Sequence, residues 1–179
     1  MGILDFIKRR ESQRVNTESL STYLLTARNN IKLASEHIGK FLQDTNDFEP
    51  ASRHRALYQD EVVKKLKIVR GGILGGLIFI DERMRNELNT QNPIRNVNQL
   101  KLLVEEWIKT LDSSDEEVYD VLKILQVEMW SEDKARRGFP LPRNNELVCN
   151  YLTKTVDYLK EARDNLDNYS TLTNVPETD

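Results

Sequence analysis

The chain has almost none of the residues on which disulfides and metal sites depend. Cys149 is the only cysteine, and His37 and His54 are the only histidines, among 179 residues. One cysteine excludes an intramolecular disulfide and a cysteine-based zinc site, and it fits a reducing compartment. Neither histidine belongs to a Glu-x-x-His or His-x-x-x-His unit, so we expect no zinc or di-iron site and no other cofactor. Cys149 follows the apolar Val148, which favours a packing role over a nucleophilic one.

Long apolar runs are also missing. The longest uncharged apolar run covers residues 71–80, which is half of the roughly 20 residues that a membrane-spanning helix requires. No signal-peptide pattern precedes it. We therefore expect a soluble, cytoplasmic protein. A chain of 179 residues with 39% hydrophobic and 31% charged residues is long enough to bury one core, so we expect a single domain.

Apolar residues recur at alternating spacings of three and four along most of the chain, which is typical of helices with one buried stripe. The pattern predicts helices over residues 18–43, 53–89, 98–111, 115–136 and 145–169. Ser113 and Ser114, followed by acidic residues, resemble a capping box, which predicts that the third and fourth helices form an antiparallel hairpin.

The fold class that follows is all-α: a single-domain helical bundle of about five helices. A short amphipathic N-terminal segment is expected over residues 1–15, the bundle over residues 16–169, and a disordered C-terminal tail over residues 170–179.

The most unusual segment is the decapeptide 71–80, which holds four of the seven glycines inside a predicted helix. Each glycine costs a helix roughly 1 kcal/mol relative to alanine, so a close backbone approach should compensate. Three interpretations remain open: a close crossing within the chain against Ala27 or Ala34, a self-association face, and a hinge. Residues 77–80 are apolar on all sides and should lie at the centre of the core. The candidate interface residues are Gly71, Gly72, Ile73, Gly75, Gly76 and Phe79.

Two basic clusters are candidates for other contacts. Residues 51–100 carry nine positive and five negative groups, a balance of +4, whereas residues 101–179 carry ten and seventeen, a balance of −7. The first cluster could contact nucleic-acid phosphates and consists of Arg53, Arg55, Lys64, Lys65, Lys67 and Arg70. The second forms an N-terminal arm that could touch a membrane or dock on a partner and consists of Ile3, Leu4, Phe6, Ile7, Lys8, Arg9 and Arg10.

Acidic and aromatic residues have structural interpretations. Glu117 and Asp120 have the spacing of a magnesium-binding pair, but a matching Glu-x-x-Glu unit is missing, so we interpret these carboxylates as helix-start acids. Trp107, Trp130 and Phe139 are expected to gather where the predicted hairpin meets the last helix.

The sequence therefore predicts a non-enzymatic helical interaction or adaptor protein, in a regulatory or accessory role. It would bind itself as a homo-oligomer, or a protein partner, through its glycine-rich helix face and the apolar seams of its helices. The alternative is a nucleic-acid-binding accessory protein, for instance an RNA-binding one, that uses residues 53–70. A metal-dependent all-α enzyme is a third, less favoured hypothesis.

Overall fold

A computed structural model describes the backbone of residues 3–89, 97–130, 136–138 and 140–173; the side chains of residues 3–21, 79, 83–89, 97–101, 103, 128 and 172–173 are outside the description. The secondary structure of these residues consists of helices, without a strand. The elements are α1 (Ile3–Asp44), α2 (Ser52–Ala56), the π-helical η1 (Leu57–Lys64), α3 (Lys65–Asn89), α4 (Val97–Lys123), the π-helical η3 (Ile124–Met129) and α6 (Asn145–Thr173).

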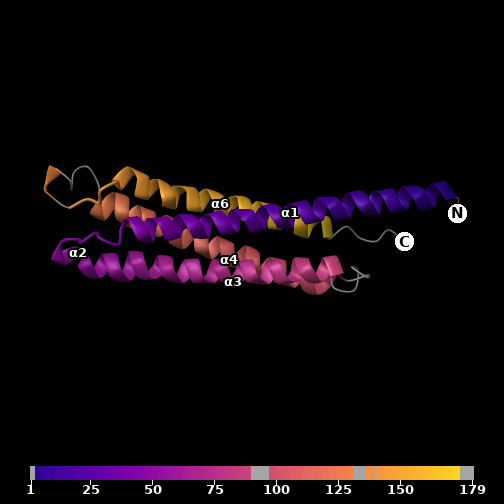
Figure 1. The fold of residues 1–179 in the computed structure, drawn as a ribbon, viewed down its shortest axis with the longest axis horizontal. Coiled ribbons are helices and arrows are strands. Elements are labelled where there is room, and N and C mark those ends of the chain that lie inside the picture. Colours follow the sequence, from indigo (N-terminus) through magenta and orange to yellow (C-terminus); the bar gives the residue numbers. More distant parts are fainter. Residues whose placement is uncertain (1–2, 90–96, 131–135, 139, 174–179) are drawn as a thin grey trace.

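The long helices form an up-and-down bundle, in which each runs antiparallel to the one before it (Figure 1). α1 packs against α3 and α6, and α4 packs against the same two helices. The all-α helical bundle that the sequence predicts is therefore confirmed. Each long helix lies at one corner of the bundle and keeps one side facing outward.

The predicted hairpin between residues 98–111 and 115–136 is wrong, because α4 runs through Ser113 and Ser114 without a turn. Ser114 is buried inside the bundle. One buried stripe continues across this point at a spacing of seven residues, through Val104, Leu111, Val118 and Leu125. Burying one continuous stripe stabilises the uninterrupted helix by more than a capping interaction at Ser113 or Ser114 would stabilise a break. The described part of the bundle therefore has four long helical rods rather than five.

The second rod consists of α2, η1 and α3, and it confirms the prediction of one continuous helix across the glycines. The helical path continues from Ser52 through η1 into α3 and ends at Asn89, so the glycines at 71–76 neither break nor end it. The helix therefore shows no break at this segment of the kind that a hinge would produce. No helix in the described ranges combines the length and the apolar character that crossing a membrane would require.

The chain ends differ from the expected segments. Residues 3–15 are not a separate element but the first turns of α1, and they extend beyond the other helices in Figure 1. At the other end α6 continues to Thr173, past the residue where we expected disorder to begin. Residues 174–179, which complete the predicted tail, lie outside the described residues.

The core consists of the stripes that the sequence predicts. The buried members of the α1 stripe are Leu24, Ala27, Ile31, Ala34, Ile38 and Phe41, and those of the α6 stripe are Val148, Leu152, Thr155, Leu159, Ala162 and Leu166. The α6 stripe lies directly along α1, which makes this pair the most extensive helix contact in the bundle.

The aromatic residues do not gather as expected. Trp130 packs at the α2 end of the bundle, with its ring centroid 5.5 Å from that of Phe48 and 6.1 Å from that of Phe41. Trp107 lies more than twenty residues earlier on the same rod and packs against α3 instead. The two tryptophans separate because the expected hairpin, which would have brought them together, does not form. Phe139 lies outside the described residues.

Candidate functional site

The outward side of α3 carries an apolar, uncharged surface that we call the outer face of α3. Its members share exposure to solvent and lie between Lys67 and Asp81; they are Ile68, Gly71, Gly72, Leu74, Gly75 and Ile78. The exposed fractions of the three large side chains are 63% for Ile68, 40% for Leu74 and 63% for Ile78. Exposed aliphatic side chains gathered on one face are typical of contact surfaces rather than of scattered surface residues.

The glycines on this face have no close neighbour among the residues that the structure describes. A Cβ atom added at Gly71, Gly72 or Gly75 would have nothing within 4 Å of it. The predicted close crossing against Ala27 or Ala34 is therefore wrong for these three glycines. Their cost to the helix is not offset by packing in the monomer.

Gly76 is different from the other three. A Cβ atom there would overlap the indole ring of Trp107, which lies against this point of α3. Gly76 is thus the residue at which a close approach occurs inside the chain, and the helix that approaches is α4 rather than α1. Of the remaining two candidate interface residues, Ile73 is fully buried in the core, so it is not on the surface as predicted, and the side chain of Phe79 lies outside the described side chains.

The expectation that residues 77–80 lie at the centre of the core is only partly met. Ile80 is buried and Leu77 is half-buried, but Ile78 is among the most exposed large apolar side chains. A signal for this was present, because Ile68, Leu74 and Ile78 fall outside the three-and-four spacing of the buried residues on the same helix. A second apolar stripe on one helix indicates a second surface that could pack against another helix.

Two contacts hold α3 firmly on α1 behind this face. The guanidinium of Arg28 donates two hydrogen bonds to the carboxylate of Asp81, of which the Nη2–Oδ2 bond measures 3.0 Å. Arg70 donates from Nε to the backbone oxygen of Ser35 at 3.2 Å. Arg28 belongs to α1, and Arg70 reaches from α3 toward α1, so neither side chain interrupts the outer face of α3. The face is presented on a fixed helix rather than on a loop.

Charged residues limit the outer face of α3 at its two ends. Lys64 and Lys67 are exposed at the N-terminal end, and Glu82 is exposed at the C-terminal end. Shallow grooves run along both sides of the face. One groove is lined by Leu42 and neighbouring α1 residues together with Gly71 and Leu74, and the other is lined by Gly72 and α4 side chains between Glu106 and Glu117.

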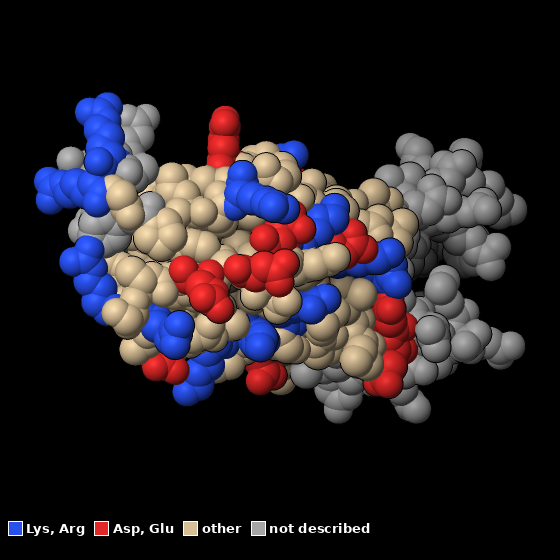
Figure 2. Space-filling view, turned by 60° about the vertical axis from the view of Figure 1, so that its left-hand side comes forward, with Lys and Arg blue, Asp and Glu red and all other residues tan. Residues whose placement is uncertain are grey.

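The structure divides the basic residues proposed for nucleic-acid contact. Lys65 forms an ion pair with Glu61 at 2.8 Å, and Arg70 is half-buried against α1. The other four side chains, Arg53, Arg55, Lys64 and Lys67, are exposed. Figure 2 shows Lys and Arg side chains interspersed with Asp and Glu on the face that it presents. The residues of the predicted N-terminal arm form the first turns of α1, and their side chains lie outside the described ones.

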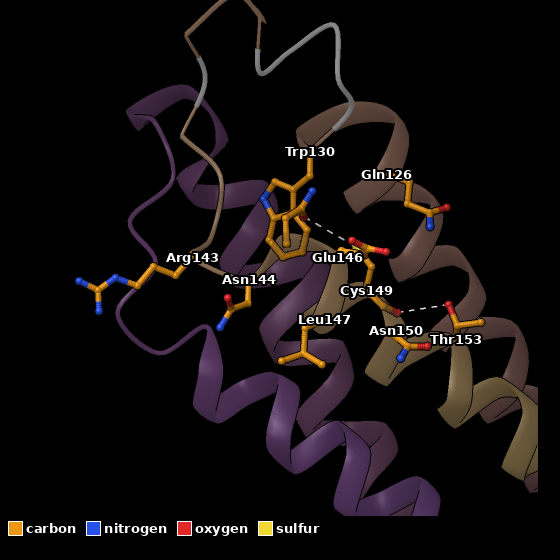
Figure 3. Close-up of a pocket in the computed structure, with 10 residues that line it drawn as sticks. Gln126, Trp130, Arg143, Asn144, Glu146, Leu147, Cys149, Asn150 and Thr153 are labelled. Atoms are coloured by element: carbon orange, nitrogen blue, oxygen red, sulfur yellow. Dashed lines mark hydrogen bonds between the residues drawn. The ribbon is translucent and has the colours of Figure 1, made fainter.

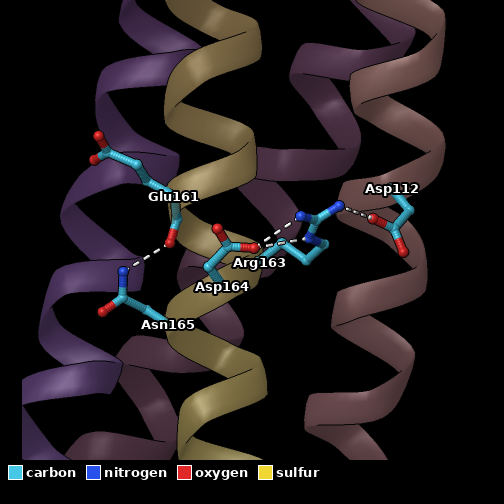
Figure 4. A network of polar contacts seen from close by, with 5 residues as sticks. All are labelled: Asp112, Glu161, Arg163, Asp164 and Asn165. Atoms are coloured by element: carbon cyan, nitrogen blue, oxygen red, sulfur yellow. Dashed lines mark hydrogen bonds and ion pairs between the residues drawn. The ribbon is translucent and has the colours of Figure 1, made fainter.

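The acidic residues 115–117 and Asp120 do not follow a helix start, because α4 continues through Ser113 and Ser114. Asp112 accepts a hydrogen bond from Arg163 of α6 at 3.3 Å, and Arg163 also donates to Asp164 (Figure 4). The pKa of Lys65 is raised, first by its hydrogen bond with Glu61 and to a smaller extent by the charges of Asp120 and Glu117 across the α3–α4 boundary. The described residues contain no group of three side chains placed to bind a metal ion.

A polar pocket lies at the end of the bundle, between η3 and α6 (Figure 3). Its lining includes Gln126, Trp130, Arg143, Asn150 and Cys149. Cys149 is half-buried, and desolvation raises the pKa of its thiol to about 11. The reactive thiolate is therefore scarce at neutral pH, in keeping with the packing role that the sequence predicts.

Comparisons with known proteins give no match: neither a family model, nor a curated protein, nor a solved structure resembles this chain. The residues of the chain itself are therefore the basis for a functional proposal.

Proposed function

We propose that this chain is a non-enzymatic helical interaction protein that docks another helix, from a second copy or from a protein partner, on the outer face of α3. The observation that carries the proposal is the combination of three open glycines with the exposed Ile68 and Ile78 on one side of a rigid helix. Residues without side chains let a second helix backbone approach closely, and the flanking aliphatic side chains then lose their contact with water.

The exposed glycines destabilise α3 in the monomer, and no packing contact with a described residue offsets this effect. Three solvent-facing glycines disfavour the helix by about 1 kcal/mol each relative to alanine. Gly76 is compensated by Trp107, whereas Gly71, Gly72 and Gly75 are not. A docked helix would supply the missing contacts at these positions. We also place the protein in the cytoplasm, where its single half-buried thiol would stay reduced.

The docking proposal is tested with a double substitution, Ile68→Glu with Ile78→Glu. Two carboxylates on the outer face of α3 must be desolvated when a helix docks, so complexes should be lost while the bundle stays folded. The measurement is the mass of the protein by light scattering after size-exclusion chromatography, for the purified protein and in an extract of its own cells. Circular dichroism confirms that helix content is unchanged.

The bundle offers a matched control. Leu102 in α4 and Val127 in η3 are as exposed as the two isoleucines, at 66% and 62%, but lie on a different rod. Leu102→Glu with Val127→Glu should leave the complexes intact. If both double variants shift the mass equally, or if neither does, docking on the outer face of α3 is refuted.

A further inference from the structure

We propose that the occupant of the outer face of α3 is the α3 helix of a second copy, in antiparallel orientation, with a two-fold axis at the level of Ile73. This inference rests on the proposed docking function and names the partner. It is carried by the way in which the exposed residues of α3 are arranged about Ile73.

Four of the six members of the outer face of α3 are placed symmetrically about this residue. The other two, Gly72 and Leu74, lie one residue on either side of Ile73 and differ in size. Ile68 and Ile78 lie five residues on either side of Ile73, and Gly71 and Gly75 lie two residues on either side. When two such helices run antiparallel about this point, Ile68 of one copy lies level with Ile78 of the other, and Gly71 lies level with Gly75. One patch therefore matches itself, which is the property of a two-fold interface between identical chains.

Charges extend the same symmetry. Lys64 and Glu82 each lie nine residues from Ile73. Nine residues are two and a half turns of an α-helix with about 3.6 residues per turn, so both side chains point to the side opposite the buried Ile73. Both are exposed. In the antiparallel pair, Lys64 of each copy lies level with Glu82 of the other, roughly 13 Å from the axis.

The same charges argue against a parallel pair. In a parallel two-fold arrangement each residue meets its own copy, so that Lys64 would face Lys64 and Glu82 would face Glu82. Like charges at both ends would oppose association, whereas the antiparallel arrangement pairs opposite charges at both ends. Charge complementarity therefore selects the second copy and its direction.

Open glycines at the axis make the close approach feasible. Gly71 and Gly75 lie two residues on either side of Ile73, and a Cβ atom at either has free space around it. Two helices can therefore cross with their backbones close together at this point, while Ile68 and Ile78 close the contact on both sides of the crossing. Because the interface is self-complementary, it closes as a dimer and does not propagate into a filament.

The experiment uses two charge-reversal variants of the full chain, Lys64→Glu and Glu82→Lys. Alone, each places like charges against each other at both ends of the antiparallel dimer. Mixed in equal amounts, they restore both opposite-charge pairs in a heterodimer. Analytical ultracentrifugation of each variant and of the mixture should show a dissociation constant raised about tenfold in each single variant and close to that of the unchanged protein in the mixture.

Three other outcomes overturn the inference. An unchanged protein that remains monomeric at roughly 1 mM shows that the occupant is not a second copy. Single variants that dimerise as well as the unchanged protein show that Lys64 and Glu82 do not face each other. A mixture as weak as its components excludes the antiparallel register. In each case the double variant of Ile68 and Ile78 still decides separately whether the outer face of α3 docks a different helix.

Discussion

Gly76 lies directly against the indole ring of Trp107, at a distance that leaves no room for a Cβ atom. This pair is where α3 and α4 approach each other, because a glycine on one helix accommodates the largest side chain on the other. The glycine on the neighbouring position, Gly75, faces solvent. Adjacent residues of one small-residue pattern therefore have opposite roles, one inside the bundle and one on its surface.

Substitution of Gly76 by alanine should destabilise the bundle. The added Cβ atom would lie far inside the van der Waals contact distance of three carbons of the Trp107 ring, so the cost of overpacking should lie in the upper part of its usual range, at about 2–3 kcal/mol, offset in part by about 1 kcal/mol of improved helix propensity. We expect the free energy of unfolding to fall by about 1–2 kcal/mol, seen as a lower urea midpoint with an unchanged slope. A Gly76→Ala variant as stable as the unchanged protein would show that the ring does not lie there.

Gly75→Ala should have the opposite effect on the folded monomer. A Cβ atom at this position meets no neighbour, so the free energy of unfolding should rise by about 0.5–1 kcal/mol from helix propensity alone. The same Cβ atom would hold a docked helix away and weaken association. The measurement is urea unfolding at a concentration where the protein is monomeric, alongside ultracentrifugation at a higher one. A substitution that destabilises the monomer would contradict the exposed position of Gly75.

The ion pair between Arg28 and Asp81 should contribute modestly to the contact of α1 with α3. Both side chains are close to 30% exposed, which limits the stabilisation to about 0.5–1 kcal/mol despite the bidentate geometry. Asp81→Asn should lower the free energy of unfolding by that amount. The exposed pair Lys32–Glu36, at 3.9 Å, supplies a control, and Glu36→Gln should change stability by a few tenths of a kcal/mol at most. If Asp81→Asn and Glu36→Gln changed the free energy of unfolding equally, the Arg28–Asp81 pair would contribute no more than an ordinary exposed ion pair.

Asp115 should make stability depend on pH. Desolvation raises the pKa of its carboxyl group above the ordinary value, although Lys160 and Arg163 lower it in part. The folded state then holds the proton more tightly than the unfolded chain. This contribution to stability is complete below the ordinary aspartate pKa of about 3.9 and is lost as the pH rises through the raised pKa.

The corresponding variant is Asp115→Asn, which is neutral at every pH. It should be more stable than the unchanged protein at pH 7 by several tenths of a kcal/mol, and this difference should vanish below about pH 4. The measurement is urea unfolding across pH 3–8. Asp157→Asn, at an exposed position of α6, controls for the loss of one net charge. A difference for Asp115→Asn that stays constant with pH would contradict the desolvated position of this carboxylate.

The buried stripes of α1 and α6 could be predicted from sequence because three-and-four spacing records directly which side of a helix faces the core. The same reasoning placed the second helix correctly across its glycines. It did not find that α4 continues past Ser113, since a capping box is a local signal and the seven-residue spacing on both sides of it is a property of the whole helix. Burial of the continuous stripe in the bundle therefore outweighed the local capping signal.

The candidate site could be located from sequence but not assigned to a side of its helix. The spacing of Gly71, Gly72, Gly75 and Gly76 defines two neighbouring rows on one helix. Which row faces the core depends on Trp107, which comes from a distant part of the chain. Exposure of Ile78 is decided in the same way, since its helix could have buried either apolar stripe.

The most direct test of the account is site-specific photo-crosslinking from the outer face of α3. A photoreactive amino acid replaces Ile78 in one version of the 179-residue chain and Val127 in another, because both positions have nearly the same exposure, 63% and 62%. The account predicts a discrete cross-linked dimer from position 78, joined to residues near position 68 of the second copy, and little product from position 127. Equal cross-linking from the two positions, or none from position 78, would contradict a docking surface on α3.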